Sequence, residues 1–370
     1  MTSATALRLP LLLCLLAGSS VLAAADRDDI SGGEQNFAQR CVSCHAKPAG
    51  RIPDIGALRQ RSPEQLVQAM RSGAMRAQAS GLSVFQMQGI AGFLTGRMPV
   101  ERAEAVDEPN RCAREPRSAR DANRLQALLA PLADDWNGWG RDHANTRYAP
   151  NPGFKAADLP RLRLKWAFGY RGSYVYGQPV MVAGRVYVTS SSGRVHSLDL
   201  ASGCVHWSYS AETAVRSAIV LGNVGGQAAL YFGDDAGNVY ALQAADGKLL
   251  WKRRVDAHAQ ARITGALKLH DNVVYVPVSS FEEIVAADSR YPCCTFVGSL
   301  QALDARTGDP IWVAKTLNAP QPLRLSDAGT QLHGPAGAAI WNSPTLDAER
   351  GIIYVGTGNS YTAEPVSYTH

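Results

Sequence analysis

Two different hydrophobic periodicities divide the chain. Between residues 26 and 98, apolar residues recur at the spacing of amphipathic helices. From residue 134 onward, short apolar runs with an alternating pattern are separated by glycine-containing turns, which is typical of antiparallel strands. Residues 99–133 are charged and contain few large apolar side chains. We therefore expect a helical domain over 26–98, a linker over 99–133 and an all-β domain over 134–370.

The helical domain contains two clear helix starts. Ser62 precedes Pro63, which predicts an N-cap followed by a first helical position. A last helix is expected to begin at Leu82–Ser83 and to end at Gly96. In the linker, a short helix is expected over 118–132.

The β-rich region contains an internal repeat. Each copy has an apolar strand, a glycine turn, a second alternating strand, and a third strand that ends in tryptophan. These tryptophans are Trp166, Trp207, Trp251 and Trp312, and a further copy begins at Ile353. Short strands with a periodic glycine and aromatic residue predict a β-propeller with one blade per repeat. The longer third interval places an insertion at about residues 281–297.

The first 25 residues are typical of a secretory signal peptide. Arg8 precedes an apolar run over 9–22, and Ala23–Ala25 offers a small-residue cleavage site. The run is shorter than the roughly 20 residues that span a bilayer, and no other segment is apolar enough, so we expect no membrane span. A periplasmic, oxidising location follows.

The charge of the chain excludes one class of partner. Its 37 Lys and Arg against 32 Asp and Glu give a formal net charge of +5. These residues are scattered, without a basic run interleaved with aromatic residues, so we expect no nucleic-acid partner.

Residues 41–45 read Cys-Val-Ser-Cys-His, the C-x-x-C-H pattern of covalent haem c attachment. Cys41 and Cys44 can each bond to the haem edge, and His45 can supply the proximal imidazole. A zinc site would need a second Cys or His pair, and a thioredoxin-like pair would need a βαβ setting. Neither is found in the sequence, so the motif predicts haem c.

Around this motif, residues 26–98 resemble a class I cytochrome c domain. In that family, a methionine before the last helix is the distal iron ligand, and Met75 matches this position. Met98, after the last helix, is the competing candidate. The resemblance implies that His45 and Met75 bind the haem iron and that this domain transfers electrons.

The Ala-Leu-Asp…Thr-Gly…Trp type of repeat resembles the quinoprotein alcohol dehydrogenases, which bind pyrroloquinoline quinone (PQQ) in an eight-bladed propeller. Residues 136–148 resemble that family's first strand. The resemblance implies an incomplete propeller of about four blades over 134–370, and it places the family's catalytic Asp beyond residue 370. We therefore expect this chain to be a fragment without the catalytic base. Non-catalytic propellers of outer-membrane assembly share such repeats, so a propeller scaffold fused to an electron-transfer cytochrome is one alternative.

Five residues match the family's cofactor site. Trp341 matches the tryptophan under the quinone, and Glu283 and Asn359 match its calcium ligands. Arg216 and Thr264 fall where the family places contacts to the quinone carboxylates. Oxygen ligands suit Ca²⁺, which would polarise the quinone as a Lewis acid.

The cysteines leave two pairings open. Cys293 and Cys294 are adjacent, and the family often has a strained bridge between neighbouring cysteines above the quinone. Their place in the insertion resembles the polyvinyl alcohol dehydrogenase branch, which also has an N-terminal cytochrome; two free thiols are the alternative. Cys112 either pairs with Cys204 or stays free.

Together, the resemblances imply a periplasmic quinohaemoprotein dehydrogenase. It would oxidise alcohol groups, of polyvinyl alcohol or other secondary alcohols, at PQQ and Ca²⁺. Electrons would pass to the haem and then to an external carrier such as a soluble cytochrome. A dehydrogenase of small primary alcohols or sugars is the second alternative.

Overall fold

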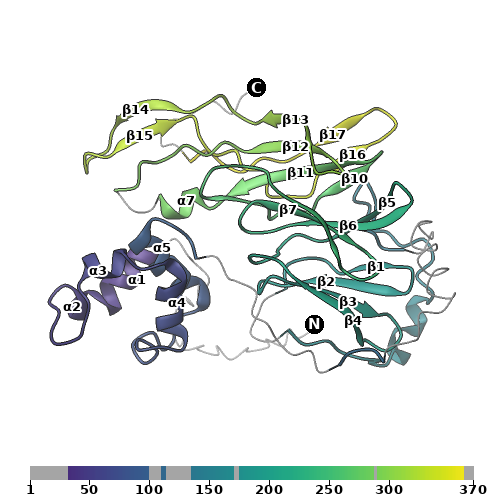
Figure 1. Ribbon diagram of the computed structural model, residues 1–370, viewed down its shortest axis with the longest axis horizontal. Coiled ribbons are helices and arrows are strands. Elements are labelled where there is room, and N and C mark those ends of the chain that lie inside the picture. Colours follow the sequence, from purple (N-terminus) through teal and green to yellow (C-terminus); the bar gives the residue numbers. More distant parts are fainter. Residues whose placement is uncertain (1–31, 100–109, 114–134, 171–174, 287–289, 362–370) are drawn as a thin grey trace, which may run out of the picture.

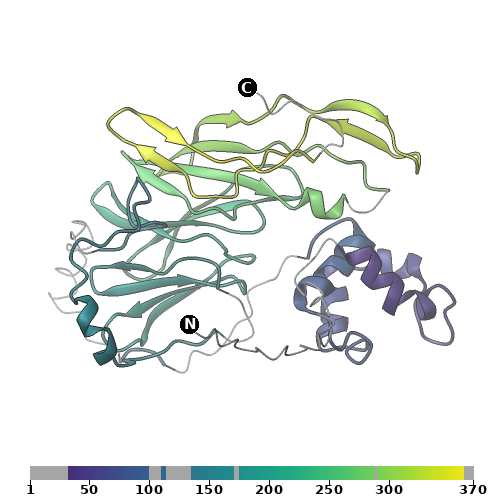
Figure 2. The same cartoon turned by 180° about the vertical axis from the view of Figure 1, so that it is seen from behind.

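A computed structural model describes residues 32–99, 110–113, 135–170, 175–286 and 290–361. A helical unit lies beside a stack of antiparallel sheets (Figures 1 and 2). The predicted signal peptide over 1–25 and the linker helix expected over 118–132 lie outside the described residues. None of the helices in these ranges is long and apolar enough to cross a membrane.

The helical unit is built from short helices around one apolar core. Its elements are α1 (Gly33–Arg40), α2 (Val42–His45), α3 (Ile55–Arg59), α4 (Pro63–Arg71) and α5 (Val84–Thr95). The predicted cap at Ser62 and the predicted start at Leu82–Ser83 are confirmed: Ser62 caps α4 and Ser83 caps α5, each accepting a hydrogen bond from the backbone N–H three residues later. Gly96 ends α5 in the left-handed conformation, at a φ of 66°.

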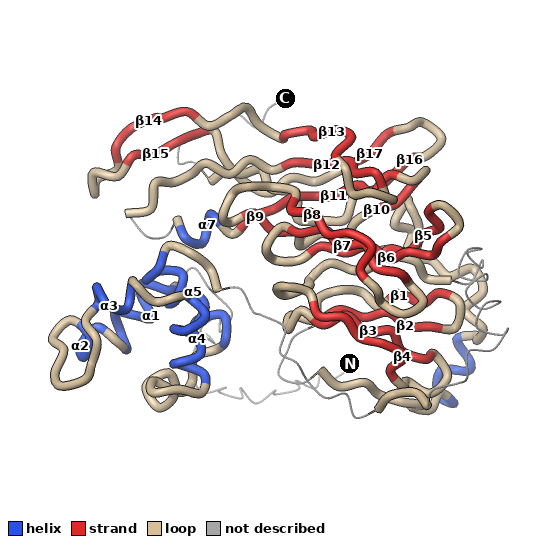
Figure 3. The backbone as a smooth tube through the Cα atoms, viewed as in Figure 1, coloured by secondary structure: helices blue, strands red, loops and turns tan. Residues whose placement is uncertain are grey.

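The described strands form a series of antiparallel sheets in chain order (Figure 3). The first sheet contains β1 (Val180–Val182), β2 (Arg185–Thr189), β3 (Arg194–Asp199) and β4 (Val205–Ser210). The second contains β5 (Val220–Val224), β6 (Gln227–Gly233), β7 (Asn238–Gln243) and β8 (Leu249–Arg254). The third contains β10 (Lys268–His270), β11 (Val273–Ser280), β12 (Ser299–Asp304) and β13 (Pro310–Lys315), with β9 (Ala261–Arg262) paired to the end of β11. This succession of meandering sheets is a β-rich, propeller-like fold.

Two hairpins follow the third sheet. They are β14 (Gln321–Leu325) with β15 (Gln331–Gly334), and β16 (Thr345–Asp347) with β17 (Ile352–Tyr354). The short helix α7 (Glu282–Val285) opens the predicted insertion, and a 3₁₀ helix, η1 (Ala156–Arg161), precedes the first sheet. Two apolar clusters, one between each pair of neighbouring sheets, form the core of the stack.

The segment 136–148 is not the strand that its resemblance implied. Apart from Trp136, which bridges to Met181, it consists of turns and irregular backbone. Arg141, Asn145 and Arg147 have φ values of 80°, 55° and 54°, which a strand cannot contain. Trp166 also lies outside any strand, in extended backbone that packs on the first sheet.

The periodic tryptophans and glycines tie each sheet to the next. Trp207, at the end of the first sheet, donates its indole N–H to the carbonyl of Ala244 in a turn of the second. A Cβ on Gly247 of that turn would lie 2.5 Å from the same indole, so only glycine fits. The same tie joins Trp166 to Leu200 over Gly203, and Trp251 to Ala305 over Gly308. Trp312 holds the corresponding position in the third sheet and is 40% exposed.

A disulfide settles the open pairing of Cys112. Cys112 is bonded to Cys204, 92 residues away, beside the start of β4. Two backbone hydrogen bonds to Val205 hold the same segment. The N–H of Cys112 donates to the carbonyl of Val205 at 3.0 Å, and the N–H of Val205 donates to the carbonyl of Asn110 at 2.8 Å. The structure therefore fastens residues 110–113 to the first sheet.

Candidate functional site

The five predicted contact residues of the cofactor site line one cavity. Its volume is about 690 Å³. Arg216 precedes β5, Thr264 precedes β10, and Glu283 lies on α7. Trp341 lies between β15 and β16, and Asn359 follows β17. The fold thus brings together residues that span most of the described β region.

Trp341 presents a flat aromatic face to this cavity. Its side chain is 63% exposed, whereas most large aromatic residues of the sheets are buried. The loop that carries Asn359 is tied beneath it, because the N–H of Gly358 donates to the carbonyl of Ala339 at 2.8 Å. Asn342 further holds this loop by donating to the carbonyl of Gly356 at 2.7 Å. The exposed indole and the amide of Asn359 are therefore held as one unit.

Helix α7 separates two neighbouring glutamates. Glu283 lines the cavity, and within the described chain its carboxylate has no hydrogen-bond or ion-pair partner. Desolvation raises the pKa of Glu283 above its ordinary value. An exposed carboxylate at the edge of the cavity is suited to a cation, and the amide oxygen of Asn359 adds a second hard donor.

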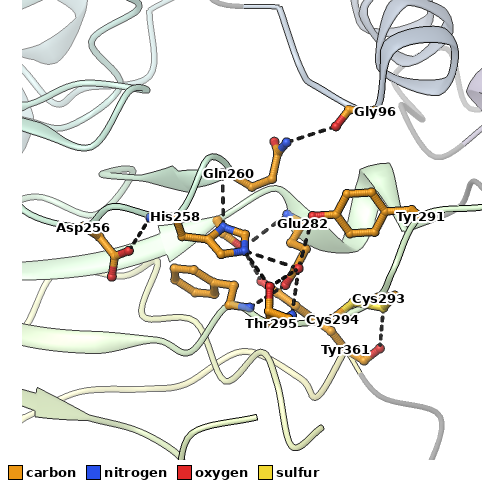
Figure 4. Close-up of polar contacts among 12 residues, drawn as sticks. Gly96, Asp256, His258, Gln260, Glu282, Tyr291, Cys293, Cys294, Thr295 and Tyr361 are labelled. Atoms are coloured by element: carbon orange, nitrogen blue, oxygen red, sulfur yellow. Dashed lines mark hydrogen bonds and ion pairs between the residues drawn. A yellow bond between two sulfur atoms is a disulfide. The ribbon is translucent and has the colours of Figure 1, made fainter. Parts of the chain in front are cut away.

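Glu282 lies on the other side of α7 and is fully buried (Figure 4). Its carboxylate accepts hydrogen bonds from the backbone N–H groups of Thr295 and Phe296, both at 2.8 Å, and from the hydroxyl of Tyr291 at 3.2 Å. The imidazole of His258 lies 3.4 Å away. Desolvation favours the neutral form, but His258 and the backbone donors outweigh it and hold the pKa of Glu282 below its usual value. Glu282 therefore fastens the insertion to α7 and is not available to the cavity.

Arg216 contributes an unused donor to the cavity wall. Its guanidinium carbon lies 4.5 Å from the ring centroid of Tyr176 and 5.5 Å from that of Phe281. Its Nε is buried and has no hydrogen-bond partner among the described residues. Thr264 is less free, because its hydroxyl shares a 2.9 Å hydrogen bond with that of Ser279. An anionic, planar, oxygen-rich group such as PQQ fits a wall with an exposed indole and a guanidinium group.

The entry segment supplies lining residues that were not predicted as contacts: Trp139, Asn145 and Arg147. Lys268 holds this segment, although nothing in the sequence marks it. Its ammonium donates to the carbonyls of Trp139 at 2.9 Å and Asp142 at 2.7 Å, and to the side-chain oxygen of Asn145 at 2.6 Å. Burial lowers the pKa of Lys268 to about 8. This buried cation fixes one wall of the cavity.

Cys293 and Cys294 form a disulfide, but they do not line this cavity. The sulfur of Cys293 lies 3.6 Å from the carbonyl oxygen of Tyr361, and Tyr361 is in the wall. The pair therefore stands behind the wall, and the direct contact implied by the resemblance is not part of this arrangement.

A second cavity, of about 140 Å³, lies inside the helical unit and is mostly apolar. Cys41, Cys44, His45 and Met75 line it together, whereas Met98 does not. The Nδ1 of His45 lies 2.7 Å from the carbonyl oxygen of Pro53, so it donates there and leaves Nε2 as a ligand atom. Both thiols are free, and burial raises the pKa of the Cys41 thiol. The chemistry of this donor set fits a covalently attached haem.

Comparisons with known proteins show which proteins this chain resembles. Residues 224–334 match the family model described as outer membrane protein assembly factor BamB. A polyvinylalcohol dehydrogenase from Pseudomonas sp. is 38% identical over 351 residues, covering 92% of this chain and 54% of that protein. The chain is thus similar to polyvinylalcohol dehydrogenases and, more distantly, to quinohemoprotein alcohol dehydrogenases.

A second relative and a solved structure give the same result. A polyvinylalcohol dehydrogenase from Sphingopyxis sp. (strain 113P3) is 37% identical over 343 residues, covering 90% of this chain and 52% of the relative. The crystal structure of quinohemoprotein alcohol dehydrogenase from Comamonas testosteroni superposes with a TM-score of 0.51, at 23% identity, over 66% of this chain and 40% of that one. The latter likeness shows the shared fold. This chain spans about half the length of the curated polyvinylalcohol dehydrogenases that it matches.

Proposed function

We propose that this chain carries the cofactor sites of a periplasmic quinohaemoprotein that oxidises alcohol groups. The convergence of Trp341, Arg216, Glu283 and Asn359 on one cavity is the observation that supports this function most strongly. In a propeller that serves only as a scaffold, we would not expect an exposed indole, a guanidinium group and a carboxylate without a partner to lie at the same cavity. The roles proposed for this chain are cofactor binding and electron transfer. No residue of the chain is assigned as the family's catalytic base.

The residues of the large cavity have separate roles. Trp341 would stack on the planar face of PQQ, and Arg216 would pair with its carboxylates. Glu283 and Asn359 would hold Ca²⁺ through oxygen atoms. When bound, PQQ with its cation supplies a two-electron acceptor for an alcohol C–H bond.

The helical unit would hold haem c. Cys41 and Cys44 would anchor it, and His45 and Met75 would bind its iron. Helix α5 supports this role because Ile90 and Leu94 line the haem cavity, while Val84 and Phe85, at its start, face the sheets. Helix α5 therefore contributes to the proposed haem cavity and also lies on the side of the helical unit nearest the sheets (Figure 1).

We further propose a secondary-alcohol polymer of the polyvinyl alcohol type as substrate. The support is sequence similarity to two proteins named polyvinylalcohol dehydrogenase. An external one-electron carrier, such as a soluble cytochrome, would then reoxidise the haem.

Cofactor binding tests the proposal directly. The chain is exported in a host with c-type haem maturation and titrated with PQQ, with and without Ca²⁺, while quenching of tryptophan fluorescence is followed. We expect a red protein that binds PQQ in a Ca²⁺-dependent manner, and binding that weakens in Trp341→Ala. Uptake of haem without any uptake of PQQ would instead support a non-catalytic propeller fused to a cytochrome.

Substrate oxidation is then assayed on the complete gene product with polyvinyl alcohol, small secondary alcohols, primary alcohols and sugars. Dye reduction and haem reduction are recorded in parallel. We expect both signals with secondary alcohols. A preference for primary alcohols or sugars would contradict the proposed substrate class and leave the cofactor assignment standing.

A further inference from the structure

Three cavities lie in a row from the candidate cofactor site to the surface between the two units. The large cavity shares Tyr176, Arg216 and Phe281 with a middle cavity of about 50 Å³. The middle cavity shares Met98, Asp235 and Arg262 with an outer cavity of about 190 Å³. Neighbouring cavities are thus separated only by side chains that belong to both.

The two units form opposite walls of this row. Val84, Phe85 and Gln88 of α5 line the middle cavity, and α5 lies beside α7 in both ribbon views (Figures 1 and 2). Exposed Arg97 and Arg254, one from each unit, line the outer cavity. The row therefore opens at the surface between the helices and the sheets.

Buried polar atoms without partners lie along this row. They are Arg216 Nε, Asp235 Oδ1, Arg262 Nε and Gln260 Oε1, and none has a hydrogen-bond partner in the described part of the chain. Buried polar atoms are almost always paired with protein or with water. A water molecule takes up about 30 Å³, so both smaller cavities are large enough to hold water. Donors and acceptors spaced along such a row are suited to a chain of water molecules.

We propose that this row is a hydrated proton exit from the oxidation site, and that Asp235 is the side chain that carries protons along it. This inference rests on the proposed function. Converting CH–OH to C=O releases two electrons and two protons, with the quinone as the oxidant. A haem accepts only the electrons one at a time, so the protons need a route of their own. The row provides one whose lining shares no residue with the haem cavity.

Asp235 differs from its neighbour Asp234 in a way that suits this role. The Asp234 carboxylate accepts hydrogen bonds from Tyr240 at 2.8 Å, Asn238 at 3.0 Å and the backbone of Ala236 at 2.9 Å. By contrast, the Asp235 carboxylate has one long contact, 3.8 Å to Arg262.

Several charged groups face Asp235. Desolvation raises its pKa, Arg262 and Arg216 oppose this rise, and the charge of Asp234 adds to it; the balance lies above the usual value. Glu64, Arg97 and Arg254 lie across the outer cavity. A carboxyl group without a fixed donor can take up a proton and return it without breaking a hydrogen bond of the fold.

Infrared spectroscopy tests the proton carrier without PQQ or turnover. The haem-containing chain is titrated with acid, and the C=O stretch of protonated carboxyl groups is recorded in H₂O and D₂O. On acidification, we expect one such band to appear at a pH higher than that at which ordinary aspartates take up a proton. This band should be lost in Asp235→Asn. It should persist in Asp309→Asn, whose carboxylate is exposed and pairs with Arg253. Absence of the band from the wild-type chain would overturn the assignment of Asp235.

Turnover of the complete gene product tests the exit itself. We expect Asp235→Asn to slow steady-state haem reduction by roughly tenfold, below the 10²–10⁴-fold range for a group at the reacting centre, and to increase the solvent deuterium isotope effect. Asp235→Glu should recover most of the rate, and PQQ affinity should stay unchanged. An unaltered rate, pH profile and isotope effect in Asp235→Asn would refute the exit. If the wild-type gene product shows no turnover at all, the proposed function and the exit are both refuted. The infrared result would still decide whether Asp235 binds a proton.

Discussion

Glu282 and Glu283 are adjacent in the chain but have different roles. Glu282 stabilises the fold, and Glu283 faces the candidate cofactor site. Glu282 is surrounded by donors, and Glu283 meets only the cavity. The repeat pattern places both at the end of a strand, and only the family spacing favours Glu283. The sequence could therefore predict which glutamate faces the cavity, but not the network that holds its neighbour, because His258 and Thr295 come from distant segments.

The two glutamates should respond differently to the same substitution. Glu283→Gln should weaken Ca²⁺ binding strongly and leave the unfolding midpoint without Ca²⁺ almost unchanged, because Glu283 is exposed and its carboxylate stabilises no other part of the described chain. Glu282→Gln should lower the free energy of unfolding by about 1–3 kcal/mol, because hydrogen bonds to a buried charge are lost. Calcium titration and urea denaturation of both variants measure this; equal losses of stability would contradict the assignment.

The two candidate methionine ligands can be separated in the same manner. Met75 lines the haem cavity, while Met98 packs on Gly92 and faces the sheets. Met75→Ala should change the absorption spectrum and lower the reduction potential of the haem, since a thioether ligand is lost. Met98→Ala is the matched control and should alter only stability. A spectral change confined to Met98→Ala would reverse the ligand assignment.

The elements were largely predictable where local chemistry decides them. The caps at Ser62 and Ser83 and the stop at Gly96 follow from side chains within a few residues, and all three were predicted. The entry segment was not, because its tertiary contacts with Lys268 override the strand pattern. The same reason applies to the row of cavities, whose walls come from units far apart in sequence.

Two glycine substitutions can measure how much the contact between Trp207 and the turn at residues 244–247 contributes to stability. Gly247 and Gly184 have φ values of 74° and 76°, but only Gly247 meets an indole, since nothing lies within 4 Å of a Cβ at Gly184. Gly184→Ala should cost about 1–2 kcal/mol from backbone strain alone. Gly247→Ala should cost about 1–3 kcal/mol more, because the added methyl group displaces Trp207. Chemical denaturation measures both; equal costs would show that the tie contributes little.

On the scale of the whole molecule, the Cys112–Cys204 bridge joins the segment after the helical unit to the first sheet. Replacing both cysteines with serine should lower the free energy of unfolding of the sheets by about 2–4 kcal/mol, because the unfolded chain gains freedom. The haem spectrum should not change, since the bridge lies outside the helical core. Thermal unfolding followed separately by circular dichroism and haem absorbance tests this; coincident shifts in both signals would indicate that the two units unfold together.

The tryptophan contacts between neighbouring sheets follow the order of the chain. Each sheet supplies an indole that is covered only by a turn formed later in the chain, as Trp207 is covered by residues 244–247. A nascent chain leaving the ribosome therefore carries one uncovered tryptophan at its growing edge, and each new turn covers the last one while exposing the next. Stability then passes between nearest neighbours, as in other repeat arrays. Opening should begin at the sheet whose tryptophan is most exposed, which among the described sheets is the one that carries Trp312.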